Sequence, residues 1–573
     1  MPRTGGLKVN KSERNRTFVV FIFFGIWVFV ILGFLINIQI FNYKKYTAKV
    51  KAQSNRIFKL HPKRGTIYDV NGEILAISVK TKSVFLNNKQ KNESIALFNL
   101  LRKKLYLSYR KQKNIKRRIR KGDGFIWIKR KLNSNEIAKL SRIAKYESYK
   151  STIAYLDEYK RIYPQRTSAA HIIGGVGIDE QGLSGIEYEF DSDIMGRGGK
   201  IEVLTDAKHR VFDFKYLEKP ISGKDIYLTI DHSIQYFVEK ELSKAVRFHK
   251  AKGGSVIVMN SKTGQILAMA SSPFFRPDRI GKVNQNILKN KAISFLYAPG
   301  STFKIILAAS ALENNICYPQ QVFNCHNGVY NVSDRTIYDV HPYSSLTFEG
   351  VIIKSSNIGA AMIGQRIGKR RYYNSILEFG FGARTGIDLP GEEKGILNSL
   401  KRWSKVSVAY LAHGYEISVT PIQMIRAFNV IASGGYLIKP GIIDKITRTK
   451  MMNPGRVKIM DRSTLQRLTS IMTGVVNIGT GKKTIIAGID IAGKTGTAKK
   501  LKWGKYRKIY VSSFGGFFPA KNPRITMFVV IDEPKNGFYG GDVAAPLFKS
   551  IAEKLLIYLK IFPELDERNE VRI

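Results

Sequence analysis

A serine and a lysine one helical turn apart offer the first recognisable chemistry in this sequence. In YAPGSTFKIILAAS (Tyr297–Ser310), a Pro-Gly pair ends a loop and an apolar helix begins. This pattern places Ser301 at a helix N-terminus, with Lys304 facing the same side. A serine hydroxyl needs an adjacent base to act as a nucleophile, and a lysine amine can be that base once burial lowers its pKa. The helix N-terminus would also favour a developing oxyanion.

Two further motifs accompany this pair. KSSNIG begins 53 residues after Ser301 and contains Ser355 and Asn357 in an S-x-N spacing, and GKTGTAKK contains the K-T-G run Lys494–Gly496. An isolated S-x-x-K recurs constantly by chance, but three such motifs in one order do not. S-x-x-K, S-x-N and K-T-G together resemble the signature of penicillin-binding proteins and class A β-lactamases.

Other blocks narrow this resemblance, which extends from the N-terminal apolar segment to about Lys560. Three blocks resemble the N-terminal region of class B penicillin-binding proteins: RGTIYDVNG (Arg64–Gly72), RIYPQRTSAAHIIGGVG (Arg161–Gly177) and GLSGIEYEFD (Gly182–Asp191). Three more are similar to the cell-division member, the septal peptidoglycan transpeptidase: KRWSKVSV (Lys401–Val408), KTGTAKK (Lys494–Lys500) and FYGGDVAAPLF (Phe538–Phe548).

The resemblance implies a role for each catalytic residue. Ser301 would attack the carbonyl of the penultimate D-Ala in a pentapeptide stem, forming an acyl-enzyme and releasing the terminal D-Ala. Lys304 would take the serine proton, and Ser355 would relay a proton to the leaving group. Asn357 would hold both Lys304 and the amide of the donor peptide.

The resemblance also implies a substrate-binding strand. Lys494 and Thr495 would bind the terminal carboxylate, and the backbone N–H of Thr497 would join that of Ser301 in an oxyanion hole. Thr497 could also contact the carboxylate. A side chain at Gly496 would obstruct the strand edge that receives the peptide. An amine from a neighbouring stem would resolve the acyl-enzyme in a 4→3 cross-link, and β-lactams would acylate Ser301 as mimics of D-Ala-D-Ala.

Two positions depart from the family pattern. Its usual G-Y-G is here Gly414-Tyr415-Glu416, which puts an acid where a flexible glycine is expected, and its N-R-A is Asn290–Ala292 with a lysine in the middle. The second change is chemically mild, whereas the first bears on the geometry of the loop beside the donor.

A charge-free stretch near the N-terminus predicts a membrane anchor. Phe18–Ile36 contains no charged residue and extends to Phe41, long enough to cross a bilayer. Basic residues precede it, as expected for an N-terminus on the cytoplasmic side, although four lysines also follow it. A cleaved signal peptide is the alternative, but no A-x-A-like site follows. An uncleaved anchor in the inner (plasma) membrane of a bacterium, with the catalytic part in the periplasm, is the interpretation.

The expected fold class is α+β, with one transmembrane helix, an elongated pedestal, and a transpeptidase domain whose antiparallel sheet is flanked by helices. The expected parts are a cytoplasmic tail (1–17), the anchor (18–41), a class B dimerisation-type pedestal (42–223), the transpeptidase domain (224–560) and a C-terminal tail (561–573). In the N-terminal part, local patterns predict a hairpin over His61–Ser78, a helix over Asn92–Leu105 and a second helix that begins at the capping box Asn133–Glu136. In the transpeptidase domain they predict a strand and helix over Asp225–Val246 and a hairpin over Gly253–Ser272. Toward the C-terminus they predict strands over Tyr510–Phe517 and Arg524–Ile531 and a helix over Ala545–Lys560.

Composition excludes several classes of protein. Lysine and arginine number 94 against 44 acidic residues, but this basicity extends along the whole chain and points to no nucleic acid. Between Arg102 and Arg130 there are thirteen basic residues and one acid, which predict a solvated helix and loop, with contact to a membrane surface or a partner as the alternative.

The cysteines, the histidines and an aspartate near the C-terminus are expected to have structural roles. Two cysteines exclude a disulfide scaffold, and Cys317 and Cys325 are expected either reduced or paired. His171 and His413 are expected as packed histidines, and Asp542 as a solvated turn residue. No metal-ligand spacing is present, so neither a metal nor a cofactor is expected.

The leading function is septal peptidoglycan D,D-transpeptidation during cell division. Elongation-type transpeptidation remains an alternative, as does a mainly scaffolding role in which the chain recruits a glycan polymerase; a D,D-carboxypeptidase is disfavoured by the class B pedestal. The expected partners are peptidoglycan stem peptides, β-lactam antibiotics, a glycan polymerase, other division proteins, and the membrane through one helix.

Overall fold

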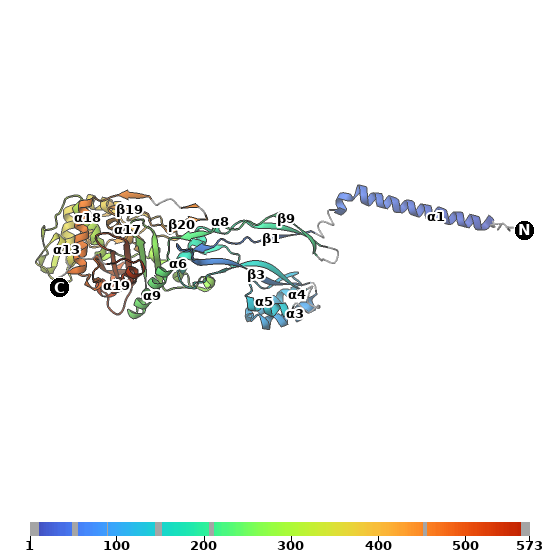
Figure 1. Ribbon diagram of the computed structural model, residues 1–573, viewed down its shortest axis with the longest axis horizontal. Coiled ribbons are helices and arrows are strands. Elements are labelled where there is room, and N and C mark those ends of the chain that lie inside the picture. The colour runs from blue at the N-terminus through green and yellow to red at the C-terminus, as the bar shows by residue number, and fades with distance from the viewer. Residues whose placement is uncertain are drawn as a thin grey trace, which may run out of the picture. The chain divides into compact units, whose positions relative to one another are not determined.

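The computed structural model describes residues 11–47, 55–88, 90–143, 152–205, 211–447, 449–450, 455–502 and 504–562 (Figure 1). The chain divides into two compact units. One combines Met1–Pro62 with Arg197–Ile221, and the other combines Lys63–Gly196 with Ser222–Ile573. The predicted C-terminal tail from Pro563 onward lies outside the described residues.

The first unit contains the apolar helix. Helix α1 (Lys11–Ile36) continues in a π-helical turn, η1 (Asn37–Phe41). The 28 residues Arg14–Phe41 are apolar enough to cross a membrane and their large side chains are exposed. At ~1.5 Å per residue they span about 42 Å, more than the ~30 Å hydrocarbon core. The helix therefore fits a single-pass membrane anchor. A three-stranded antiparallel sheet of order β1–β8–β9 completes the unit: Asn55–Leu60, Gly199–Thr205 and Val211–Glu218.

The second unit begins with a sheet that draws strands from distant parts of the chain. Its order is β21–β20–β10–β2–β3–β4, and β5 also pairs with β3. The predicted hairpin over 61–78 is confirmed as β2 and β3, joined by a turn in which Gly72 has a φ of 85°. The strands are β2 (Ile67–Tyr68), β3 (Ile74–Asn87), β4 (Phe125–Lys129), β5 (Ile153–Ile162), β10 (Ile226–Leu228), β20 (Ile443–Ile446) and β21 (Thr449–Lys450).

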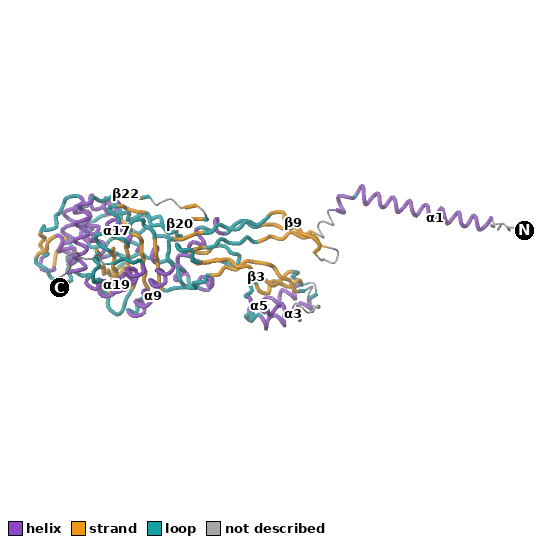
Figure 2. The backbone as a smooth tube through the Cα atoms, in the orientation of Figure 1, coloured by secondary structure: helices purple, strands orange, loops and turns teal. Residues whose placement is uncertain are grey.

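Beyond the end of β3 lies a small subdomain, residues 90–143, which we call the head (Figures 1 and 2). Its helices are α3 (Lys91–Lys104), α4 (Tyr109–Lys121) and α5 (Ser134–Ile143). The predicted capping box is present, because the Asn133 and Glu136 side chains each accept a hydrogen bond from the other's backbone N–H. The expectation of helix and loop throughout the basic stretch was wrong at β4, where Ile126 and Ile128 alternate into the core.

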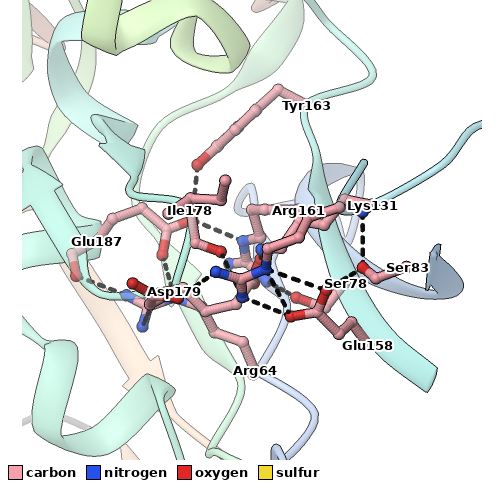
Figure 3. Close-up of polar contacts among 12 residues, drawn as sticks. Arg64, Ser78, Ser83, Lys131, Glu158, Arg161, Tyr163, Ile178, Asp179 and Glu187 are labelled. Atoms are coloured by element: carbon pink, nitrogen blue, oxygen red, sulfur yellow. Dashed lines mark hydrogen bonds and ion pairs between the residues drawn. The ribbon is translucent and has the colours of Figure 1, made fainter. Parts of the chain in front are cut away.

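A buried ion network joins the blocks that resembled the class B N-terminal region (Figure 3). Glu187 accepts from Arg64 Nε at 2.6 Å and from Arg161 Nε at 2.7 Å, and all three side chains are almost fully buried. Arg64 also pairs with Asp191 at 2.6 Å. Because both arginines share Glu187, removal of this carboxylate takes from the buried Arg161 the acid that it pairs with, at a cost of about 3–5 kcal/mol.

The catalytic part is built around an antiparallel sheet of order β12–β11–β25–β24–β23, with β23 at one edge. The predicted hairpin over 253–272 is confirmed as β11 (Gly253–Asn260) and β12 (Ile266–Ser272). The remaining strands are β23 (Ala492–Lys502), β24 (Lys505–Phe518) and β25 (Ile525–Asp532).

Alternating side chains of this sheet pack on two layers of helices. In β25, Met527 and Val529 face a core shared with α9 (His232–Phe248) and α19 (Gly540–Tyr558). Phe528 and Val530 face the larger core, which contains α12 (Lys304–Glu313) and α17 (Pro421–Ala432). This arrangement confirms the expected α+β class, with helices on both faces of an antiparallel sheet.

The remaining elements are short. Between β5 and β8 lie α6 (Ala170–Ile173), β6 (Gly175–Val176), β7 (Gly182–Ser184), α7 (Gly185–Glu189) and α8 (Asp191–Ile194). The segments around the catalytic helices include α13 (Phe348–Lys354), α14 (Asn357–Ile367), α15 (Lys369–Glu378), α16 (Ser407–Ala412), α18 (Arg462–Asn477), and the hairpin of β14 (Val329–Val332) with β15 (Arg335–Tyr338). Short helices and bridging strands complete the unit: η3 (Pro277–Lys282), α10 (Gln285–Leu288), α11 (Lys291–Ser294), β13 (Val322–Asn324), η5 (His326–Gly328), β16 (Ser345–Thr347), β17 (Ile396–Leu397), η6 (Leu400–Arg402), β18 (Ile417–Ser418), β19 (Tyr436–Ile438), β22 (Arg456–Lys458) and η7 (Lys482–Thr484).

Candidate active site

Ser301 lies in a 3₁₀ turn, η4 (Gly300–Phe303), that leads directly into α12. The turn fits tightly because two glycines face each other: the Gly300 N–H donates to the Gly414 carbonyl at 3.1 Å. A Cβ on Gly414 would meet Gly300 O at 2.1 Å. Ser301 lines a cavity of about 350 Å³, and Lys304 begins the buried helix behind it.

Lys304 is fully buried and held by the S-x-N segment. Its Nζ donates to the Ser355 carbonyl at 2.6 Å and to Asn357 Oδ1 at 2.9 Å, and lies 3.3 Å from Ser355 Oγ. Burial lowers the pKa of Lys304 to about 7, against the opposing effect of the Asp339 charge. An amine with this pKa is substantially neutral at neutral pH and can accept a proton.

The S-x-N segment links two helices. Ser355 follows α13 in a left-handed conformation, with a φ of 63°, and Asn357 begins α14. Asp339, which follows β15, holds this junction: it accepts hydrogen bonds from the backbone N–H groups of Asn357 and, at 3.1 Å, of Ile358.

Asp339 was not foreseen from the sequence. Its other oxygen accepts from Ser356 Oγ at 2.5 Å, and the adjacent Tyr338 carbonyl accepts from Asn357 Nδ2 at 3.0 Å. These contacts lie 17 to 19 residues apart in the chain, at the start of α14, so no local spacing pattern could reveal them.

The K-T-G segment lies on the edge strand β23. Lys494 is fully buried, and its Nζ donates to Ser355 Oγ at 3.0 Å, so this hydroxyl lies between the two lysine amines. Burial and the charge of Lys304 hold the pKa of Lys494 well below its usual range. Thr495 Oγ1 is 2.6 Å from Thr480 Oγ1, and Thr497 Oγ1 accepts from the Gly540 N–H at 2.8 Å.

The structure gives a different reason for a glycine at 496. A Cβ there would come within 2.5 Å of Ser513 Oγ and 2.8 Å of Thr302 Cγ2. The clash is thus with the neighbouring strand β24 and with the turn that carries Ser301. Glycine lets these two elements approach each other, in addition to any need to leave the strand edge open.

Several other side chains line the cavity. Val340, His341 and Tyr343 follow β15, and Tyr539 precedes α19. Asp542 also lines it, but as a residue in the first turn of α19 that pairs with Lys483 at 2.8 Å, so the expectation of a turn residue was wrong. The helix begins at Gly540, five residues earlier than the sequence pattern indicated.

The histidines, the cysteines and the altered loop can now be placed. His413 and His171 are buried and hydrogen-bonded to the carbonyls of Ala409 and Ile287, as expected of packed histidines. Cys317 and Cys325 are buried and free. Glu416 has a φ of 59°, so it occupies the left-handed conformation that suits glycine. Its neighbour Tyr415 accepts a hydrogen bond from the Lys499 N–H at 3.3 Å.

The fold and the cavity together define a serine acyl-transfer enzyme. Two buried lysine amines, one on the catalytic helix and one on a sheet edge, meet around the hydroxyl of Ser355. Ser301, at its turn, lines the same cavity as Ser355. No group of three or more His, Cys, Asp or Glu side chains within the described ranges could hold a metal ion.

Comparison with known proteins gives the family. Residues 254–553 match the penicillin binding protein transpeptidase domain and residues 59–228 match the penicillin-binding protein dimerisation domain. The chain belongs to the penicillin-binding proteins, and the dimerisation domain places it in class B. It is a serine-type D-Ala-D-Ala transpeptidase.

Relatives cover most of the chain. It is 34% identical over 518 residues to a probable peptidoglycan D,D-transpeptidase, PenA, of Neisseria meningitidis, covering 89% of this chain and 87% of that protein. It is 31% identical over 547 residues to peptidoglycan D,D-transpeptidase FtsI of Escherichia coli K12, covering 93% and 90%. The crystal structure of penicillin binding protein 3 from Mycobacterium tuberculosis, complexed with ampicillin, has a TM-score of 0.70 at 27% identity, covering 89% of this chain and 98% of that one.

Proposed function

We propose that this chain cross-links peptidoglycan stem peptides at the division septum, with Ser301 as the nucleophile. The observation that carries this proposal is the convergence of two buried lysine amines on the Ser355 hydroxyl beside a serine-lined cavity. The septal assignment rests on the three blocks similar to the cell-division member, Lys401–Val408, Lys494–Lys500 and Phe538–Phe548.

The acylation step uses the neutral amine of Lys304. Ser301 Oγ attacks the carbonyl carbon of the penultimate D-Ala while Lys304 accepts its proton. The carbonyl oxygen becomes an oxyanion that the backbone N–H groups of Ser301 and Thr497 stabilise. The peptide C–N bond then breaks, and the proton passes from Lys304 through the Ser355 hydroxyl to the departing D-Ala amine.

Donor binding prepares this base. The terminal carboxylate of the donor binds at Lys494 and Thr495, next to the hydroxyls of Thr480 and Thr497. A carboxylate there favours the ammonium form of Lys494, and that positive charge disfavours a second one on Lys304. The substrate thus helps to keep the catalytic base neutral.

Transfer completes the reaction. The amine of a neighbouring stem attacks the ester carbonyl and gives a proton to Lys304. The bond between the carbonyl carbon and Ser301 Oγ then breaks as the new amide forms, and Lys304 returns the proton to Ser301 Oγ. Asn357, held by Asp339, positions both Lys304 and the donor amide. β-Lactams acylate the same serine.

The apolar N-terminal helix and the basic residues that precede it support the proposed cellular setting. The N-terminus lies in the cytoplasm, one helix crosses the inner membrane of a bacterium, and the catalytic part lies in the periplasm. A glycan polymerase and other division proteins supply the nascent strands that this chain cross-links.

Fluorescent penicillin labelling of membranes tests the nucleophile. Wild type gives a stable covalent band and Ser301→Ala gives none. Ser310→Ala is a matched control, because Ser310 lies on the same helix but is buried against Ser375 and keeps the band. A band that survives in Ser301→Ala would overturn the assignment.

Depletion and microscopy test the septal role. A fluorescent fusion gathers at the division site, and depletion yields filaments that elongate without dividing. Rounded cells with a dispersed fusion would instead support the elongation-type alternative.

A further inference from the structure

The strongest unassigned feature is the charge of the head. Helix α4 carries eight lysine and arginine residues among its thirteen and has no acidic residue. Within the described head, residues 90–143, the seventeen basic residues face three acidic ones. This excess is far denser than the average along the chain, so a general basic composition does not account for it.

The cations of α4 lie on one side of the helix. Ile115 and Ile119 are buried in the core of the head with residues of α3. The opposite side is exposed and carries side chains separated by three or four positions, which places them on one surface. We call this surface the basic face of α4: Tyr109, Arg110, Lys113, Arg117, Arg120 and Lys121.

These charges are not neutralised within the part of the chain that the structure describes. On α4, Arg118 pairs with Asp123 at 2.7 Å, at the edge of the helix. None of the five cations of the basic face forms an ion pair or a hydrogen bond there through its side chain. Cations one turn apart repel each other, so the basic face gains stability from any extended anionic surface that approaches it.

Two exposed aromatic rings lie on the basic face and next to it. Tyr106, in the connection before α4, is 82% exposed, and Tyr109 is 81% exposed. Lys139 lies over the Tyr106 ring, with Nζ 5.1 Å from its centroid. Tyrosine beside lysine and arginine is typical of protein surfaces at the level of lipid headgroups, where the ring body is apolar and its hydroxyl stays hydrated.

The chemistry of the face distinguishes between partners. The core of a protein interface is depleted of charge and built on apolar anchors, whereas here five cations lie together with no apolar side chain between them. A diffuse sheet of phosphate charge matches that pattern better. A bilayer is also always within reach, because the chain itself contains an apolar helix that fits a membrane anchor, and tethering raises the local concentration of lipid.

We infer that the basic face of α4 binds the anionic phospholipid headgroups of the membrane in which the chain is anchored. The head would then attach to the bilayer surface, in addition to the attachment through the transmembrane helix. This inference does not depend on the acyl-transfer chemistry, and a failure of either leaves the other intact.

Lipid contact can be measured on the full chain. A fluorophore at Ser108→Cys, beside Tyr109, reports the head selectively because Cys317 and Cys325 are buried. The chain is reconstituted into vesicles of phosphatidylcholine alone or with phosphatidylglycerol, both containing a spin-labelled lipid that quenches fluorescence on contact. We expect strong quenching on the anionic vesicles, little on the neutral ones, and loss of quenching at high salt.

A charge-reversed variant tests the face itself. Lys113→Glu/Arg117→Glu/Arg120→Glu should weaken the contact by at least about a hundredfold, since each cation near an anionic surface contributes about fivefold. The matched control is Arg370→Glu/Arg371→Glu/Arg384→Glu, three exposed cations of the catalytic part, and should quench like wild type. A milder Lys113→Gln/Arg117→Gln/Arg120→Gln variant gives the same result if reversal disturbs folding.

Three outcomes would overturn the inference. If the wild-type chain is not quenched on anionic vesicles, the basic face does not contact lipid, and an acidic protein partner becomes the better explanation of its charge. Equal quenching on neutral and anionic vesicles would show that headgroup charge plays no part. Quenching retained in a folded triple variant would show that lipid contacts another surface.

Discussion

Removing the charge of Asp339 should make Lys304 a base at lower pH. Burial lowers the pKa of Lys304 to about 7, and the Asp339 carboxylate acts in the opposite direction. Asp339→Asn removes this charge but keeps an oxygen that can accept from the Asn357 and Ile358 N–H groups. The variant therefore separates the electrostatic role of Asp339 from its positioning role.

The expected size of the shift in the pKa of Lys304 follows from its distance to Asp339 and from the polarity of the site. At an effective dielectric constant of about 20, two charges separated by one intervening side chain interact by about 1–2 kcal/mol, or roughly one pKa unit. In wild type, the acylation rate should rise about tenfold from pH 6 to its plateau near pH 8, because the proton must leave Lys304 first. In Asp339→Asn the same rise should shrink to about twofold.

The assay is the rate of acylation by a chromogenic β-lactam between pH 5 and pH 9. Comparing the pH 6 rate with the plateau within each variant cancels any change in the plateau itself. Asp339→Ala should show the same shift with a plateau at least about tenfold lower, because two backbone N–H groups lose a charged acceptor. Asp334→Asn, on the same hairpin and exposed, is the control.

An acid limb that stays in place, or moves to higher pH, would refute this reasoning. In the first case Asp339 would not influence the base, and in the second the pKa would change in the direction opposite to that expected from the loss of a negative charge. A shift in the Asp334→Asn control would show that the profile reports the general charge of the molecule.

Three further predictions concern packing and backbone conformation. Gly496→Ala should lower the acylation rate about a hundredfold, because the added methyl group displaces Ser513 and Thr302 and with them the turn that carries Ser301; an unchanged rate in a penicillin titration would contradict the assigned clash. Glu187→Gln should destabilise the chain by about 3–5 kcal/mol, because the buried Arg161 would lose the carboxylate that it pairs with, whereas Arg64 would keep Asp191; a thermal midpoint equal to that of wild type would show that the network relaxes without loss. Glu416→Gly should stabilise by about 1 kcal/mol, because a side chain in the left-handed region is strained; denaturant titration measures it, and a lower midpoint would mean that the carboxylate has a compensating contact.

Local patterns in the sequence predicted much of the catalytic centre. A Pro-Gly before an apolar run located Ser301 at the start of its helix, and the two apolar runs around residues 260–264 predicted the hairpin of β11 and β12. In each case the signal lies within a few residues of what it predicts. The alternation of buried Ile126 and Ile128 with less buried neighbours had the same local character, but the surrounding basic residues led to the prediction of a helix and loop instead of a strand.

The features that the sequence did not reveal join distant segments. Asp339 acts on the start of α14 from a hairpin, and Glu187 pairs with Arg64 across 123 positions of the chain. Likewise, β20 completes the sheet begun by β2 and β10, though it comes more than 200 residues later. A single sequence holds no periodicity that records such contacts, because they depend on the complete fold.

The order of strands in the central sheet has a consequence for how penicillin capture should be interpreted. β11 pairs with β25, which joins Gly253 to Asp532, and β24 connects this pair to the strand that carries Lys494. A nascent or truncated chain that lacks residues 525–532 thus has its serine and lysine but not the scaffold that holds Lys494 beside them. Covalent labelling at Ser301 would then report only molecules whose central sheet is complete. Its yield would measure the fraction of molecules that have folded through their last strand.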